Sequence, residues 1–333
     1  MTRRRRRLTR SRAIPAAVAV ALLAACNGPY DLTGAAGADR LYVDTTGAWR
    51  VAGQPEPIWA GPVLDYYDTF AAPGNFDGEG RWEPAVVDMS TGTWTTGGAR
   101  GTFVFAPPTD DDPTTGLRVS VVPADYDGDG DTDPAYYTSD TATWRIEGQA
   151  PIAFGRRTDD PSAPAVDGPP FPDIPVPADY DGDGDADLAV YRVETGEFLV
   201  QGQGTIPTGI AYGQPVPADY TSELGAEAAV MGMYGEGWAI EGEPAPRPYP
   251  DTMTGAFAVP ADYDGDGTAE LASIVAAAPF FEWRVDGEPT VSFPIGSDPT
   301  PITPLFQLAR GTDLLFLVFT STTCVAQSDP RCP

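Results

Sequence analysis

Residues 176–190 read VPADYDGDGDADLAV, and this stretch recurs along the chain and predicts its fold. One short loop carries aspartate at its first, third, fifth and ninth positions, which are Asp179, Asp181, Asp183 and Asp187. Gly182 and Gly184 lie between them, and glycine allows the positive φ with which a backbone wraps around a central ion. Alternate carboxylates, together with the backbone carbonyl of Asp185 at the seventh position, are the oxygen ligands that calcium prefers.

The same residues could also form an acidic surface turn or an EF-hand. An acidic surface turn is possible because Asp and Gly are common turn residues. An EF-hand is another possibility, but it needs glutamate at position twelve, where the chain has Val190 here and Tyr136 in a sister copy. Alternating apolar residues on both sides of a Thr195-Gly196 turn predict that a β-hairpin follows the loop. Crowded carboxylates without a cation raise one another's pKa, so calcium explains the loop best.

Two further copies of the stretch are complete. In the copy that begins at residue 122 the ligand positions are Asp125, Asp127, Asp129, Asp131 and Asp133. In the copy that begins at residue 259 they are Asp262, Asp264, Asp266, Thr268 and Glu270. Together with the opening stretch, these copies predict about three calcium ions.

The other copies are altered. The copy from residue 72 has a doubtful site, with Asn75, Asp77, Glu79, Arg81 and Glu83 at the ligand positions. The copy from residue 216 loses the glycine rhythm of its loop and predicts a blade without metal. A partial copy at 41–59 keeps the hairpin without a recognisable loop, and 312–318 is a degenerate seventh copy.

The spacing of the copies predicts the architecture. Clear copies begin 40 to 54 residues apart, and each holds several short strands. Such a period is typical of a β-propeller, in which radial repetition leaves only short edges exposed. We therefore expect an all-β fold of about seven blades.

The pattern resembles the VCBS and FG-GAP repeats of bacterial proteins and of the integrin α-subunit head, over about residues 40–318. The resemblance implies a propeller used for binding or adhesion. It also implies that the D-x-D-x-D-G-x-x-D loop binds structural calcium between the first two strands of a blade. The copies from residues 122, 176 and 259 match this pattern, whereas those from residues 72 and 216 depart from it.

The N-terminus reads as an export signal. Five arginines at 3–7 precede an apolar run at 13–25, which is too short to span a bilayer comfortably. The run ends in Leu23-Ala24-Ala25-Cys26, which resembles the lipobox of bacterial lipoproteins, whose cysteine is lipidated. The alternative is an ordinary secretory signal with an incidental Cys26, and the arginine run is a loose match to twin-arginine export. We expect a signal peptide at 1–25, the lipidated cysteine and a tether at 26–37, the propeller at 38–320 and a tail at 321–333.

Charge and cysteine content restrict the partners. Residues 1–25 hold seven of the 20 basic residues and none of the 48 acidic ones, so removing them changes the net charge from −28 to −35. That charge argues against direct binding to nucleic acid or to anionic lipid headgroups. The remaining cysteines, Cys324 and Cys332, would form a disulfide in an oxidising compartment, and the alternative is a pair of free thiols.

No catalytic site is predicted. The chain has no histidine, which excludes histidine-dependent triads, imidazole acid-base chemistry and His-ligated zinc. We therefore expect a non-enzymatic, calcium-binding adhesion or scaffold module at the cell envelope, whose partner is an unidentified protein or glycan. The alternative is a carbohydrate-binding lectin or polysaccharide lyase, which would need exposed aromatic residues. The tryptophans recur at one hairpin position, which favours packing over sugar binding: Trp49, Trp94, Trp144, Trp238 and Trp283.

Overall fold

The computed structural model describes residues 37–44, 46–64, 69–108, 119–157, 160, 171–221, 225–249, 256–277 and 280–294. Their secondary structure consists of short β-strands without a helix, so none of them forms a helix that could cross a membrane. The predicted signal peptide, Cys26 and the tether up to residue 36 lie outside these ranges. So do the seventh copy at 312–318, Cys324, Cys332 and the rest of the predicted tail.

The strands form six antiparallel sheets, which we number as blades 1 to 6 in chain order. Blade 1 has β1 (Leu41–Val43), β2 (Ala48–Val51) and β3 (Trp59–Ala60). Blade 2 has β4 (Thr69–Ala71), β5 (Ala85–Asp88), β6 (Thr93–Thr96) and β7 (Thr102–Val104). Blade 3 has β8 (Val119–Val121), β9 (Ala135–Thr138), β10 (Thr143–Ile146) and β11 (Ile152–Ala153).

The second half of the chain continues the series. Blade 4 has β12 (Ile174–Pro175), β13 (Ala189–Arg192), β14 (Glu197–Val200) and β15 (Gly204–Pro207). Blade 5 has β16 (Gln214–Pro215), β17 (Ala229–Met231) and β18 (Trp238–Ile240). Blade 6 has β19 (Ala256–Ala258), β20 (Ala272–Ala277), β21 (Phe280–Val285) and β22 (Val291–Pro294).

Each blade follows from alternation along its strands. In β10 the side chains of Trp144 and Ile146 are buried, whereas those of Thr143 and Arg145 are partly exposed. This period of two is the pattern of a strand whose faces have different neighbours. The register pairs Trp144 with Tyr137 of β9, so two large rings lie side by side within the blade.

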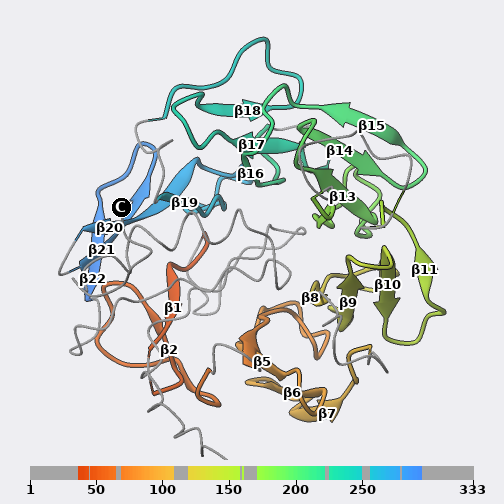
Figure 1. The fold of residues 1–333 in the computed structure, drawn as a ribbon. Helices are drawn as coiled ribbons and strands as arrows, with labels where there is room; N and C mark the ends of the chain where they lie inside the picture. The colour runs from red at the N-terminus through yellow and green to blue at the C-terminus, as the bar shows by residue number, and fades with distance from the viewer. Residues whose placement is uncertain are drawn as a thin grey trace, which may run out of the picture.

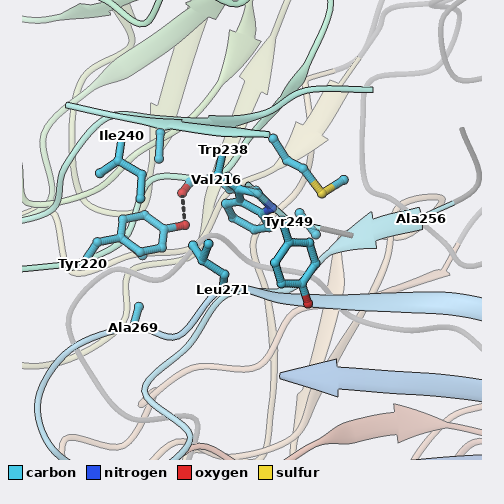
Figure 2. Close-up of a cluster of buried hydrophobic side chains, with 12 residues drawn as sticks. Val216, Tyr220, Trp238, Ile240, Tyr249, Ala256, Ala269 and Leu271 are labelled. Atoms are coloured by element: carbon cyan, nitrogen blue, oxygen red, sulfur yellow. Dashed lines mark hydrogen bonds between the residues drawn. The ribbon is translucent and has the colours of Figure 1, made fainter. Parts of the chain in front are cut away.

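The blades close into a ring (Figure 1). Six hydrophobic clusters are found, and each joins neighbouring blades. The cluster between blades 5 and 6 contains Trp238 together with Tyr220 and Leu271 (Figure 2). Between blades 6 and 1, the ring of Tyr42 stacks on that of Phe293 with centroids 4.9 Å apart. Because blade 1 packs against blades 6 and 2, the β-propeller is complete in six blades.

The prediction of seven blades is therefore wrong: the described strands form six. The degenerate segment at 312–318 had been counted as a blade because of its apolar residues alone. The contact between blades 1 and 6 leaves no gap for another sheet between them.

The tryptophans have the packing role that their recurrence indicates. Trp49, Trp94, Trp144, Trp238 and Trp283 are all buried, with at most 3% of their surface exposed. Phe198 is at the corresponding place in blade 4 and is also buried. These rings therefore stabilise the blades and are not platforms for sugar.

Candidate metal centres

The acidic loops connect the first and second strands of blades 2 to 6. Every one of them is closed by a β-bridge between the residue before its first position and the residue at its ninth. In blade 3 the bridge joins Ala124 and Asp133 through two backbone hydrogen bonds of 3.3 and 2.7 Å. The bridge holds the two ends of the loop together, so its first and ninth side chains start from fixed neighbouring positions.

In blade 3 the loop brings carboxylate oxygens of Asp125, Asp127 and Asp133 within 4.8 Å of one another. Asp125 also organises the backbone, because its Oδ1 accepts from the amide of Gly128 at 2.8 Å and its Oδ2 from that of Gly130 at 2.9 Å. Both glycines have positive φ, which lets their amides turn toward the aspartate.

Blade 4 repeats this geometry. Its acidic group consists of Asp179, Asp181 and Asp187. Asp179 is 3% exposed, and its two oxygens accept from the amides of Gly182 and Gly184 at 2.7 and 3.0 Å. Asp179 thus has two roles: its hydrogen bonds hold the loop in shape, and its carboxylate belongs to the acidic group.

Blade 6 has the largest group, with four carboxylates within 4.8 Å: Asp262, Asp264, Asp266 and Glu270. Asp262 accepts from the amides of Gly265 and Gly267 at 2.6 and 3.0 Å, as its counterparts do in the other loops. Glutamate at the ninth position serves as well as aspartate, because its Oε2 accepts from the amide of Tyr263 at 2.7 Å.

Some predicted ligands lie outside these groups. Asp129 and Asp183, at the fifth position, instead accept from the amides of Asp131 and Asp185 at 2.9 and 3.2 Å. In blade 6, Asp266 accepts from the amide of Thr268 at 2.9 Å and still belongs to the group. The seventh position was predicted to contribute a backbone carbonyl, so its side chains are not expected in the groups.

Electrostatics favours a cation in these loops. Burial, together with the charges of Asp127, Asp125 and Asp129, raises the pKa of Asp133 to about 6. Burial and the charge of Asp264 likewise raise the pKa of Glu270. A bound cation would offset the repulsion that these raised pKa values report.

The loop of blade 2, whose metal site is doubtful, is folded like the others but has different side chains at the ligand positions. Glu83 accepts from the amide of Phe76 at 2.9 Å, as the ninth residue does in every loop. Burial, followed by the charge of Asp77, raises the pKa of Glu83. Asn75 uses its side-chain amide to donate to the carbonyl of Gly130 in the next blade at 2.6 Å. Glu79 and Arg81 are exposed, so this loop offers fewer converging carboxylates.

The loop of blade 5 is held together without such a group. Glu227 accepts from the amide of Tyr220 at 2.7 Å and from the hydroxyl of Thr221. The hydroxyl of Thr221 replaces the carboxylate that the other loops have at the third position. The loops of blades 2 and 5 do not form a group of three acidic residues in the described part of the chain.

Sequence reasoning missed the residue at the second loop position. Tyr126, Tyr180, Tyr220 and Tyr263 occupy it in blades 3 to 6. Each donates its hydroxyl proton to the carbonyl four residues earlier, at 2.6 to 2.8 Å, and its amide to the ninth residue. The repeated Ala-Asp-Tyr triplet was the available signal.

Sequence reasoning also missed that the loops connect the blades. In each loop the backbone carbonyl of the first residue accepts from an amide of the next blade. The acceptor and donor pairs are Asn75 and Thr132, Asp125 and Ala186, Asp179 and Ala226, Asp219 and Ala269, and Asp262 and Ala38, at 2.5 to 2.6 Å. An ion held by the first residue of a loop would therefore stabilise the contact between two blades.

Comparison with known proteins does not assign the chain to a family. No protein-family model matches the chain, and no curated protein matches it either. The resemblance to VCBS and FG-GAP repeats therefore depends on the repeated loop itself.

Proposed function

We propose that this chain is a calcium-stabilised β-propeller that serves as a non-enzymatic binding or scaffold module on the extracytoplasmic side of a bacterial membrane. The observation that carries the proposal is the acidic group in each of blades 3, 4 and 6, in a loop that is hydrogen-bonded to the following blade. Filling these loops with cations would strengthen the ring as a whole, which is what an exported binding scaffold needs.

Calcium is the cation that suits the donors. The groups contain only carboxylate oxygens, and calcium takes six to eight oxygen ligands in flexible geometry. Zinc prefers nitrogen and sulfur ligands, and the chain has no histidine. At tenfold excess over its dissociation constant each ion would add about 1.4 kcal/mol, so three would add about 4 kcal/mol to the free energy of unfolding.

The places of the acidic and aromatic side chains support a binding role over an enzymatic one. The carboxylates that crowd together are those of the loops, and the recurring tryptophans are buried. The alternative, a lectin or polysaccharide lyase, would need aromatic rings on the surface, and the recurring set does not supply them. Trp82 is only partly buried, but it is a single residue without counterparts in the other loops.

The location is proposed from the sequence alone. The apolar run and Leu23-Ala24-Ala25-Cys26 support export and lipidation at Cys26. The net charge of −35 that remains without residues 1–25 makes the protein a poor direct ligand for anionic lipid or nucleic acid, so a covalent lipid would be the contact with the membrane. A protein or glycan of the cell envelope is the proposed partner.

A thermal melt in chelator and then in increasing calcium tests the proposal. We expect the melting temperature to rise by several degrees as calcium is added, because the ions bind the folded state. The matched control is magnesium at the same ionic strength, which should have less effect because it demands a tighter octahedral site. A melting temperature that is the same in chelator and in calcium would contradict the proposal.

A further inference from the structure

One peptide unit joins the acidic groups of blades 3 and 4. The backbone carbonyl of Asp125, the first residue of the blade 3 loop, accepts from the amide of Ala186 at 2.6 Å. Ala186 lies between Asp185, whose carbonyl is the predicted ligand at the seventh position, and Asp187 of the blade 4 group. In a planar trans peptide the carbonyl and the amide point in opposite directions. The Asp185 carbonyl therefore points away from Asp125, and only the amide of this peptide is used in the contact with blade 3.

On the side of blade 3, the residue that accepts this hydrogen bond is also a member of the acidic group. The carboxylate of Asp125 belongs to that group and accepts from the amides of Gly128 and Gly130 at 2.8 and 2.9 Å. The loops also touch at a second place, because a Cβ at Gly128 would lie 3.4 Å from the Cβ of Asp185. A shift of the peptide between residues 185 and 186 would therefore move the first residue of the blade 3 loop.

The contact between the two loops is buried. Ala186 is 8% exposed and belongs to one hydrophobic cluster with Tyr126 of the blade 3 loop and Leu188. The amide of Tyr126 donates to the carboxylate of Asp133 at 3.0 Å, so the same packing also reaches the ninth residue of that loop. Breaking a buried hydrogen bond costs more than breaking one in water, so the two loops are held to one relative position.

We propose that cations bind cooperatively to blades 3 and 4, and that the peptide between Asp185 and Ala186 couples the two sites. The inference rests on the calcium binding proposed above. A cation held by the Asp185 carbonyl would polarise this peptide and strengthen the hydrogen bond that its amide donates to Asp125. Filling one loop would also fix residues of the other, which then has less freedom to lose. The coupling is reciprocal, because each ion changes the affinity for the other by the same factor.

Repulsion between the two cations would act in the opposite direction. Each of the two acidic groups contains three carboxylates, so a group that holds one divalent cation still has a negative charge. Salt screens the interaction between exposed charges beyond about 8 Å at physiological ionic strength. The hydrogen-bonded contact is not screened in this way, because it is buried. We therefore expect the favourable coupling to exceed the repulsion.

Blade 6 provides the contrast within the same ring. Its acidic group is separated from that of blade 4 by blade 5, and from that of blade 3 by blades 1 and 2 (Figure 1). The link to blade 5 has the same form, since the carbonyl of Asp219 accepts from the amide of Ala269 at 2.5 Å. The described residues of the blade 5 loop, however, do not form a group of three acidic residues. Binding in blade 6 should therefore be independent of the other two sites.

Calcium titration of the full chain against a chromophoric chelator tests the coupling at constant ionic strength. Asp127, Asp181 and Asp264 are exposed third-position residues, so changing one of them to alanine removes a ligand from blade 3, 4 or 6. Asp264→Ala leaves the pair in blades 3 and 4, and adding Asp127→Ala or Asp181→Ala leaves one site of that pair. We expect the product of the two association constants to be about fivefold larger in the pair than for the sites measured singly.

The pair of sites in blades 3 and 6 is the matched control. Asp181→Ala leaves this pair, and the product of its constants should equal that of the two sites measured singly. A product for blades 3 and 4 that is equal to or smaller than that of the single sites would overturn the inference, as would an equal excess in both pairs. A parent protein that binds no calcium would overturn the proposed function itself, so the two failures are distinguishable.

Hydrogen exchange followed by NMR tests the peptide that carries the coupling. In Asp181→Ala, calcium should slow exchange of the Ala186 amide about fivefold, because its acceptor Asp125 belongs to the group that still binds. The Ala269 amide in Asp264→Ala is the control, because its acceptor, Asp219, lies in a loop without a described acidic group, and it should slow less. Equal slowing of the two amides would overturn this peptide as the link.

Discussion

At the scale of single residues, a carboxylate at the ninth loop position has the same structural task in five blades. It accepts from the amide of the second loop residue whether it is Asp133, Asp187, Glu83, Glu227 or Glu270. This hydrogen bond shapes the loop with or without an ion. The cation site depends instead on how many other carboxylates converge, which the residues at the first, third and fifth positions decide.

Asp181→Ala should remove one bound calcium. Asp181 is exposed and belongs to the acidic group of blade 4, so the change removes a ligand with little effect on packing. We expect the calcium content of the purified protein, measured by atomic emission, to fall by about one ion per chain. Glu56→Ala is the control, because Glu56 is an exposed acid outside the loops. Equal calcium contents in the two variants would contradict the site.

Arg156→Ala should cost far more stability than Arg247→Ala. The Arg156 guanidinium contacts Glu194 at 2.8 Å, and both side chains are 5% exposed, so the change removes the cation paired with a buried carboxylate, which keeps its hydrogen bond from the amide of Phe171. We expect a loss of about 3 to 5 kcal/mol in the free energy of unfolding. The Arg247 side chain is 38% exposed beside Glu243, and its removal should cost about 0 to 1 kcal/mol. Denaturant titration compares the free energies of unfolding of the two variants, and equal losses would contradict the greater contribution of the buried Arg156–Glu194 pair.

At the scale of elements, the blade is built from hairpins whose turns depend on glycine. Thr195-Gly196 was predicted as the turn between two strands, and the structure places it between β13 and β14. Gly196 has a φ of 70°, and a Cβ at this position would overlap the carbonyl oxygen of Ile210. The turn therefore requires glycine both for its φ and for the close approach of the chain that leads to blade 5.

Gly196→Ala should destabilise the protein more than Gly202→Ala. Both glycines have positive φ, but the space around Gly202 is open, so alanine there meets only the backbone strain. We expect about 1 kcal/mol for Gly202→Ala and at least twice that for Gly196→Ala. Thermal or denaturant unfolding measures the difference. If Gly196→Ala loses no more free energy of unfolding than Gly202→Ala, the chain near Ile210 moves away from the new Cβ without cost, and the prediction is wrong.

Across the whole ring, the described residues form six hydrophobic clusters and five backbone hydrogen bonds that join the acidic loops to neighbouring blades. Among the described residues, each hydrophobic cluster joins two neighbouring blades, so stability is shared around the ring rather than concentrated in one core. In a closed ring, weakening the packing between two blades destabilises both of those blades.

Cys26→Ala should release the protein from the membrane. If the proposed lipid is the contact with the bilayer, the variant should appear in the soluble fraction, because the acidic propeller has no attraction to anionic headgroups. Fractionation of cells that express each form, with detection by immunoblot, gives the result. Cys324→Ala is the matched control and should stay with the membrane. Retention of the Cys26→Ala form would contradict lipidation there.

The local structure can be predicted from the amino-acid sequence, because the residues that form each loop and hairpin lie within one repeat. The spacing of Asp and Gly predicted the loops, and the alternation around each tryptophan predicted the hairpins and their buried side. Both depend on interactions between residues close in the chain. The acidic groups in blades 3, 4 and 6 contain the predicted first, third and ninth residues for the same reason.

Three features depend on contacts between distant parts of the chain or on the exact loop geometry: the number of blades, the absence of the fifth loop residue from the acidic groups of blades 3 and 4, and the hydrogen bonds from each loop to a neighbouring blade. Blade number depends on whether Tyr42 of blade 1 packs against Phe293 of blade 6, a contact between residues 251 positions apart that no local pattern contains. Spacing predicts Asp129, Asp183 and Asp266 alike as ligands, but only Asp266 lies within the acidic group of its loop, although all three accept from the amide two residues on. The hydrogen bond from Ala186 to Asp125 depends on the packing angle of two blades, which is set by the shapes of buried side chains and not by the loop residues.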